Sequence, residues 1–341
     1  MSITISRSTP ASRFAGMAAF ILVALLLATP LLGNVAPWLG NIATERLIGE
    51  FMVYLALASL WNLLAGYTGL VSVGQQAFVG LGAYSLMGLG VLAEWNPLLA
   101  VPVAGLGAAV IALPVATLVF RLQGAYFAIG TWVMAEVFRL LASQLAIFGG
   151  GSGISLPAAT IKLISADKFW REATIYWLAL ALGLGSVMMV YALLRSRLGL
   201  ALTAIRDNET ASVSLGIRIE RMKFAVYVFV AGMTGMVGSL IAMQKLRISP
   251  DAAFSVNDWT AFVIFIVVIG GIGTIEGPII GTIVYFLLRE FLSNLGSIYL
   301  MILGALAITI MLFAPQGIWG FVKSRFNLSL FPTGYRVVSK E

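Results

Sequence analysis

Long uninterrupted stretches of apolar residues constrain this chain more than any other feature. The stretch FAGMAAFILVALLLATPLLGNVAPWLG, from Phe14 to Gly40, contains no charged residue, and about 20 such residues suffice to cross the hydrocarbon core of a bilayer. Only 10% of the 341 residues are charged, against about 25% in soluble domains. Charge this sparse is too little to cover a soluble surface, so the sequence predicts an all-α polytopic membrane protein.

The apolar runs predict about ten membrane-spanning helices, some with broken or re-entrant glycine-rich segments. The spans are expected at 14–36, 47–65, 73–93, 97–120, 124–147, 174–194, 224–243, 259–275, 278–295 and 298–314. A cleaved signal peptide is the alternative for the first run, because Arg7 and Arg13 resemble a positive n-region. Its apolar part, however, exceeds the ~7–15 residues of a typical signal.

Lys and Arg in the connecting segments predict the orientation, because cytoplasmic loops carry an excess of them. With both termini inside, thirteen of the 21 Lys and Arg lie in cytoplasmic segments and six lie outside. This arrangement predicts a cytoplasmic N-terminal segment (1–13), a transmembrane domain (14–314) and a cytoplasmic tail (315–341). The domain would carry an external loop at 148–173 and a cytoplasmic loop at 195–223. The net charge of +7 then reflects basic loops rather than nucleic-acid binding.

The sequence lacks the residues that several enzyme classes need. No Gly-Lys dipeptide occurs, so the phosphate-binding loop of nucleotide hydrolases is absent. There is no His and no Cys, which argues against a metal centre, a disulfide, and a Ser–His or Cys–His nucleophile. We therefore expect no cofactor, no metal and no enzymatic activity. The driving energy would come from an ion gradient or from another chain.

Charged residues inside membrane spans are by default functional candidates. The candidates here are Glu50, Glu136, Arg139, Arg289 and Glu290. Glu136 and Arg139 are three residues apart and close enough to pair, either as a structural lock or as part of a transport path. Glu50 is expected to reach water, and Arg289 and Glu290 point to different helix faces. Since no titratable cluster is present, an ion-coupled carrier that uses Glu136 or Glu50 is the less favoured class.

The stretch GYTGLVSVGQQAFVGLGAYSLMGLG, from Gly66 to Gly90, combines many glycines with polar, uncharged residues. Small residues let membrane helices approach closely, and this role is predicted for Gly69, Gly74, Gly80 and Gly82. An interrupted helix is tolerated only inside the protein or along a water-filled cavity. The polar residues would line that path or satisfy the freed backbone groups; they are Thr68, Ser72, Gln75 and Gln76.

A second cluster, GGIGTIEGPIIGTIVY, is similarly rich in small residues. Helix packing is also predicted for its Gly273 and Gly277. The segments 69–84 and 270–285 are therefore candidates for equivalent points of two repeated halves, as in many transporters. Glu276 is expected at the cytoplasmic boundary, where a carboxylate can cap a helix N-terminus.

The cytoplasmic loop is the most informative stretch outside the membrane. Asn208 is a candidate N-cap for a short helix over 209–215 that Gly216 ends. Such a helix either lies on lipid headgroups or docks into a groove of another protein. The mixed charges of Arg206, Asp207 and Glu209 favour the protein partner.

Three motifs together resemble a known family. LWNLLAGYTGLVSVGQQAFVGLGAY, AIRDNETASVSLGI and VVIGGIGTIEGPIIG, within about 47–315, are similar to permease subunits of branched-chain amino acid ABC importers. The similarity is greater to the larger of the two sister permeases. Permeases for urea, short amides and some sugars share parts of the pattern.

The resemblance implies a bacterial inner-membrane importer with a sister permease, two cytoplasmic ATPase subunits and an external substrate-binding protein. The cytoplasmic loop would carry the helix that couples to the ATPase. Glu209, Ala211 and Gly216 match the Glu-Ala-Ala…Gly pattern of importer permeases, with one extra residue between the acid and the glycine. The substrate would be a branched-chain or related hydrophobic amino acid, with urea or short amides as the alternative.

Overall fold

The computed structural model describes residues 2–6, 10–34, 41–292, 296, 298–314, 316–326, 330–331 and 336–340. Residues 35–36 and 293–295 of two predicted spans, Arg7, and parts of the predicted tail (327–329, 332–335 and 341) lie outside this description.

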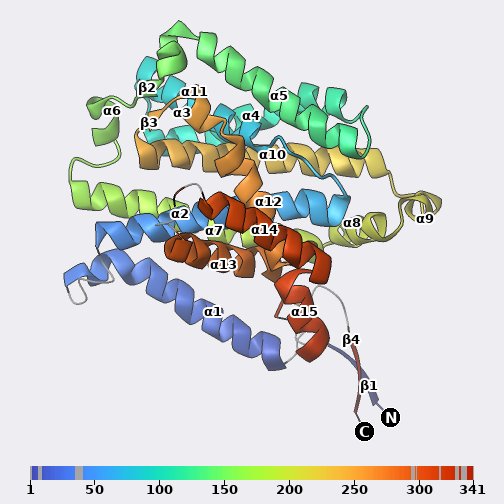
Figure 1. Ribbon diagram of the computed structural model, residues 1–341. Helices are drawn as coiled ribbons and strands as arrows, with labels where there is room; N and C mark the ends of the chain where they lie inside the picture. The colour runs from blue at the N-terminus through green and yellow to red at the C-terminus, as the bar shows by residue number, and fades with distance from the viewer. Residues whose placement is uncertain are drawn as a thin grey trace.

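The described chain is a bundle of long helices that run roughly side by side (Figure 1). The long helices are α1 (Pro10–Ala28), α2 (Ile42–Thr68), α3 (Gln75–Leu92), α4 (Pro97–Val119), α5 (Ala125–Gln144), α7 (Lys168–Arg195), α10 (Ile219–Lys245), α13 (Glu276–Leu292) and α14 (Ile298–Phe313). The shorter ones are α6 (Ala158–Lys162), α8 (Arg197–Asp207), α9 (Glu209–Ser214), α11 (Pro250–Ala253), α12 (Phe262–Gly270) and α15 (Gly317–Phe326). Three 3₁₀ turns cover Thr29–Asn34, Ala146–Phe148 and Gly150–Ser152, and a π-helical turn covers Asn257–Ala261.

Seven helical segments in the described part of the chain are long and apolar enough to cross a membrane. They are Ile42–Thr68, Pro97–Val119, Ala125–Gln144, Lys168–Arg195, Ile219–Lys245, Pro250–Gly270 and Ile298–Phe326. The polytopic helical class is thereby confirmed. The remaining predicted spans fall on α1, α3 and α13, and the total of ten stays a prediction. α13 is only 17 residues long, and two glutamines lower the hydropathy of α3.

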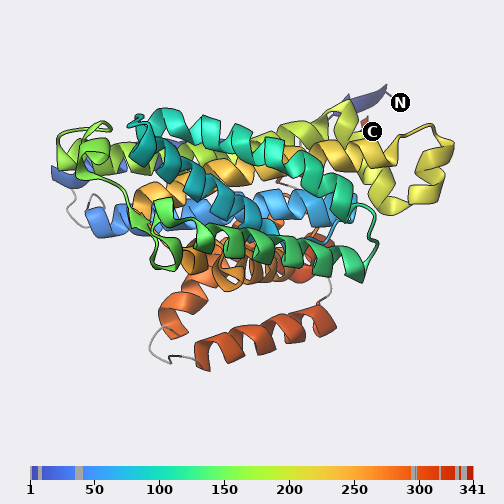
Figure 2. The same cartoon turned by 90° about the horizontal axis from the view of Figure 1, so that it is seen from above.

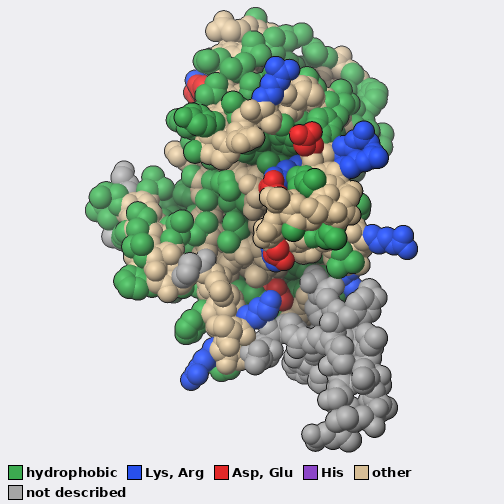
Figure 3. Space-filling model, turned by 90° about the vertical axis from the view of Figure 1, so that its right-hand side faces the viewer, with side chains coloured by type: hydrophobic (Ala, Val, Ile, Leu, Met, Phe, Trp, Pro, Cys, Tyr) green, Lys and Arg blue, Asp and Glu red, His purple; other side chains and the backbone are tan. Residues whose placement is uncertain are grey.

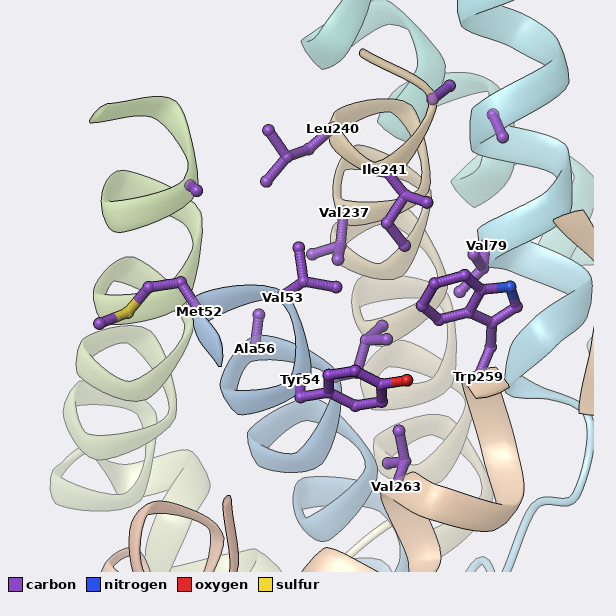
Figure 4. Close-up of a cluster of buried hydrophobic side chains, with 14 of the residues drawn as sticks. Met52, Val53, Tyr54, Ala56, Val79, Val237, Leu240, Ile241, Trp259 and Val263 are labelled. Carbon is purple, nitrogen blue, oxygen red and sulfur yellow. The ribbon is translucent and has the colours of Figure 1, made fainter. Parts of the chain in front are cut away.

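α2 forms the centre of the bundle. Nearly every residue from Met52 to Thr68 is buried, so this helix has no lipid-facing side over that length. Its neighbours are α7, α10, α12 and α13. Figure 4 shows Val53 and Tyr54 of α2 clustered with Val237 of α10, Trp259 of the π-helical turn and Val263 of α12. A helix that is apolar all round is the kind that lies at the core of a bundle.

α3, α4 and α10 pack on one another (Figure 2), and glycines lie at their contacts. A β-carbon at Gly82 of α3 would overlap the backbone oxygen of Gly235 in α10, and one at Gly238 would overlap that of Val79. A β-carbon at Gly105 of α4 would come within 2.9 Å of the oxygen of Gly232. At these points the backbones of neighbouring helices approach closely, and the side chains of Ala108 and Met236 fill the space beside them.

The two ends of the bundle differ. α8 and α9 project from one end, where β1 (Ser2–Ser6) and β4 (Arg336–Lys340) also lie (Figure 1). These two strands pair antiparallel, with Ser2 opposite Lys340. At the opposite end, β2 (Ile154–Ser155) pairs antiparallel with β3 (Arg247–Ile248) beside α6 and α11. The sequence predicts no strand at either place, because each depends on pairing between distant segments.

We predict that Gly82→Ala destabilises the bundle by roughly 1–3 kcal/mol, the usual effect of overpacking, because the new methyl group overlaps the Gly235 carbonyl. Thermal or denaturant unfolding in detergent measures the change. Gly185→Ala in α7 is the matched control, because no atom lies within 4 Å of its β-carbon position. A gain of up to about 1 kcal/mol is expected there from helix propensity. Equal stability of the two variants would contradict close packing at Gly82.

Candidate functional site

α2 and α3 are separated by a non-helical segment at 69–74. Gly69 ends α2 in the left-handed conformation, with φ of +71°, and its N–H donates to the carbonyl of Leu64. No atom lies within 4 Å of a β-carbon at this glycine. Its role is therefore conformational, unlike the close approach that the sequence predicts. At Gly74 and Gly80 a β-carbon would overlap Thr131 and the ring of Phe254, respectively, as close approach requires.

The four polar residues in and beside this segment are all buried: Thr68, Ser72, Gln75 and Gln76. The side chains of three of them form hydrogen bonds with backbone groups. The Ser72 hydroxyl accepts the N–H of Gly74 at 3.2 Å, and the Gln75 amide donates to the Leu57 carbonyl at 3.1 Å. The Thr68 hydroxyl donates to a carbonyl of its own helix. Among these three bonds, only that of Ser72 serves a group that the interruption frees, because Leu57 and Leu64 lie inside α2. A role in lining a path stays a prediction.

Gln76 joins α3 to the π-helical turn. The Thr260 hydroxyl donates to the Gln76 side-chain oxygen, and the Gln76 N–H donates back to the Thr260 hydroxyl at 3.3 Å. Both residues are almost completely buried. Single π-helical turns occur mostly at functional sites, so this reciprocal pair marks a candidate region.

A second interruption, at 271–275, separates α12 from α13, and Asn62 of α2 holds it. The Asn62 amide donates to the Thr274 carbonyl at 2.7 Å and accepts the N–H of Gly273 at 2.8 Å. A β-carbon at Gly66, one turn further along α2, would lie 2.6 Å from the Gly273 nitrogen. Sequence reasoning missed Asn62, although an amide within the apolar run LALASLWNLLAG is itself a signal.

Glycines in and beside this second interruption serve two purposes: one adopts a positive φ, and another allows a close backbone approach. Gly273 has φ of +74°, and a β-carbon at Gly277 would overlap the carbonyl of Gly271. The 69–74 and 271–275 segments are alike in following a helix and preceding another. Their equivalence as points of two repeated halves remains a prediction.

The predicted cytoplasmic loop (195–223) contains α8 and α9, which together are called the α8–α9 element (197–214). Asn208 caps α9 through its side chain, which accepts the Ala211 N–H at 3.0 Å, so the predicted N-cap is confirmed. Gly216 follows the helix with φ of +80°, and the Ile217 N–H donates to the Ser212 carbonyl at 3.1 Å. These are the bonds of a Schellman ending. α8, and the start of α10 at 219, extend the helical structure beyond the prediction.

Arg206 connects the α8–α9 element to the end of α2. Its guanidinium lies 5.8 Å from the centre of the Tyr67 ring and 3.0 Å from the carboxylate of Asp207. It also lies 3.5 Å from the β-carbon position of Gly273. Lys and Arg side chains are spread over this end of the molecule, and hydrophobic side chains dominate its flanks (Figure 3).

α9 is held to α10 by an ion pair. The Glu209 carboxylate lies 2.5 Å from the Lys223 ammonium. Ala211 and Gly216 are exposed. Of the predicted coupling residues, Arg206 contacts Tyr67 at the end of α2, and Glu209 binds Lys223 of α10.

The other charged residues of the spans form two clamps. Arg139 pairs with Glu136 at 2.6 Å, as predicted, and also with Asp251 at 2.5 Å, which ties α5 to α11. This second partner favours the structural lock over the transport role. Arg289 pairs with Glu50 at 2.8 Å and joins α13 to α2. The sequence predicts no such contact, because the two residues are far apart along the chain.

Glu276 is the first residue of α13, so its carboxylate lies at a helix N-terminus as predicted. The carboxylate also accepts the N–H groups of Leu330 and Phe331, at 3.2 and 3.0 Å. It thereby fastens a segment of the predicted tail to the start of α13.

Comparison with known proteins matches residues 43–314 to the family described as branched-chain amino acid transport system / permease component. The chain is similar to the high-affinity branched-chain amino acid transport system permease protein LivM of Escherichia coli, with 30% identity over 86% of this chain and 73% of the relative. The Salmonella typhimurium protein of the same name is 30% identical over 81% and 70%. A probable branched-chain amino acid transport permease protein LivM of Methanocaldococcus jannaschii is 22% identical over 71% and 79%. No solved structure shows a significant match.

We predict that Asn62→Ala lowers the free energy of unfolding by about 2–3 kcal/mol, because two buried backbone groups lose their partner. Unfolding in detergent measures the loss. Asn62→Asp retains the acceptor for Gly273 and is expected to lose less. Asn257→Ala removes an exposed amide and serves as the control. If Asn62→Ala behaved like Asn257→Ala, the amide would not support the interruption.

Proposed function

Since this chain belongs to the family of branched-chain amino acid transport system permease components, we propose that it is the permease subunit of an ATP-driven importer. It forms the path for a branched-chain or related hydrophobic amino acid. The observation that carries the proposal is the α8–α9 element, which projects from a basic end of a multi-pass helical bundle. A helical projection of this kind suits docking into a groove of another protein.

The proposal includes the partners and the membrane. A sister permease, two cytoplasmic ATPase subunits and an external substrate-binding protein complete the importer in a bacterial plasma membrane. The α8–α9 element faces the cytoplasm in this arrangement. Pairing of β1 with β4 places both termini at one end of the bundle, which suits an even number of crossings. The names of the relatives support the choice of substrate.

The mechanism we propose is alternating access driven through α9. ATP binding closes the two ATPase subunits, and the α8–α9 element moves with them. Arg206, whose guanidinium lies 5.8 Å from the centre of the Tyr67 ring, transmits this movement to the end of α2. The 271–275 interruption lies there, bound to Asn62, so a shift of α2 displaces the junction between α12 and α13. Because the external protein supplies selectivity, the path itself requires only weak contacts with the substrate.

Uptake measurements test the proposal as a whole. The full chain, purified with its copurifying subunits and reconstituted in liposomes, is expected to import leucine only when ATP and the loaded binding protein are present. Uptake driven by an ion gradient, with this chain alone in the liposomes, would contradict the proposal and indicate a secondary carrier.

We predict that Arg206→Gln lowers uptake per ATP hydrolysed about two- to five-fold, the factor that a cation–π contact of ~0.5–1 kcal/mol sets. Tyr67→Leu should give the same loss, and the double variant should be no worse, because both changes remove one contact. Tyr67→Phe retains the ring and should transport normally. Arg325→Gln, which removes an exposed charge from α15, is the matched control. Additive losses in the double variant would show that Arg206 does not act through Tyr67.

A further inference from the structure

A cavity of about 220 Å³ lies at the end of the bundle opposite α8 and α9. Its walls are the first turns of α2 and α7, the last turn of α10 and the π-helical turn. Pockets for drug-sized ligands measure roughly 300–1,000 Å³, so this cavity suits a smaller molecule. We call it the α2–α7–α10 cavity.

Among the charged residues that line the cavity, one acidic and one basic residue have no ion-pair partner in the described part of the chain. Arg46 is paired with Glu172 at 3.0 Å, and Glu50 is paired with the more distant Arg289. The lining charges that remain are those of Glu45 and Lys245.

The Glu45 carboxylate is the unusual member of this set. Its residue is only 6% exposed, and its side chain makes no hydrogen bond or ion pair to the residues that the structure describes. Glu172 adds negative charge beside it. The carboxylate lines the cavity without a basic partner, so a cationic group placed there would be attracted to it.

Lys245 offers the opposite charge from α10. Its ammonium lies 5.0 Å from the centre of the Trp259 ring, and the same ring contributes to the cavity wall. The ammonium thus has a cation–π contact but no carboxylate partner within the described chain. An anionic group in the cavity would supply that partner.

Apolar side chains also line the cavity. Val53, Ile175 and Ile241 line it and are 2%, 7% and 5% exposed. Figure 4 shows Val53, Ile241 and Trp259 converging from three different elements. Side chains of this kind match a short branched hydrocarbon group.

We propose that the α2–α7–α10 cavity transiently binds an α-amino acid zwitterion with a short apolar side chain. The ammonium of the ligand faces Glu45, its carboxylate faces Lys245, and its side chain contacts Val53, Ile175 and Trp259. The inference rests on the proposed function, because it identifies this cavity as the first site of the path on the side where the binding protein delivers substrate.

The absence of Cys from the sequence allows a direct test by thiol protection. Ile175→Cys, in the full chain in membrane vesicles, is labelled with a small methanethiosulfonate while the concentration of L-leucine is raised. Leucine is expected to slow labelling, whereas 4-methylpentanoate, which lacks the ammonium, and 3-methylbutylamine, which lacks the carboxylate, are not. Ile241→Cys reports the same cavity from α10. Ala159→Cys, exposed on α6, is labelled at a rate that leucine leaves unchanged.

The charged residues are tested in the same background. Adding Glu45→Gln or Lys245→Met is expected to raise the protective leucine concentration roughly ten-fold or more, as loss of a charge-assisted hydrogen bond does. The control changes Glu94→Gln and Lys162→Met, at exposed residues that do not line the cavity, leave it unchanged.

ATP-driven uptake, measured in parallel, separates the two proposals. Normal leucine uptake with no protection at either thiol, or equal protection by the two analogues, overturns the cavity site and leaves the proposed function standing. Protection by leucine without ATP-driven uptake supports the site and overturns the proposed function.

Discussion

Satisfaction of buried backbone groups is the constraint on which this bundle depends. A helix that stops inside an apolar environment leaves N–H and C=O groups that no water can reach. At 271–275 one side chain, Asn62, meets both a donor and an acceptor. At 69–74, Ser72 accepts the Gly74 N–H and Thr131 of α5 accepts the Val73 N–H. Interruptions can exist here because they themselves and the neighbouring helices α2 and α5 carry polar groups that complete them.

The two candidate functional regions, the α8–α9 element and the α2–α7–α10 cavity, both contact the central helices. Arg206 of the α8–α9 element meets the end of α2 beside the interruption that Asn62 holds. At the other end, the π-helical turn contributes Trp259 to the cavity and Thr260 to the bond with Gln76 of α3. Side chains at each end of the bundle thus contact the central helices directly.

Local patterns predicted much of this structure from the sequence, and long-range contacts account for what they missed. Apolar runs give the helices, and the short-range offsets of Asn208 and of Glu136 with Arg139 give a cap and an ion pair that the structure contains. Pairing of Glu50 with Arg289 depends on two distant helices meeting, and no local periodicity carries that information. Glycines show the same limit, because composition cannot tell a left-handed cap from a helix contact.

The glycine contacts among α3, α4 and α10 also determine which parts of the bundle are able to move. Gly82 and Gly238 lie against the backbones of Gly235 and Val79, so parting α3 from α10 would forfeit many dispersion contacts at once. We therefore expect α3, α4 and α10 to move together. Any hinge in the molecule has to lie at the borders of this trio, where long side chains and single ion pairs join the neighbouring helices.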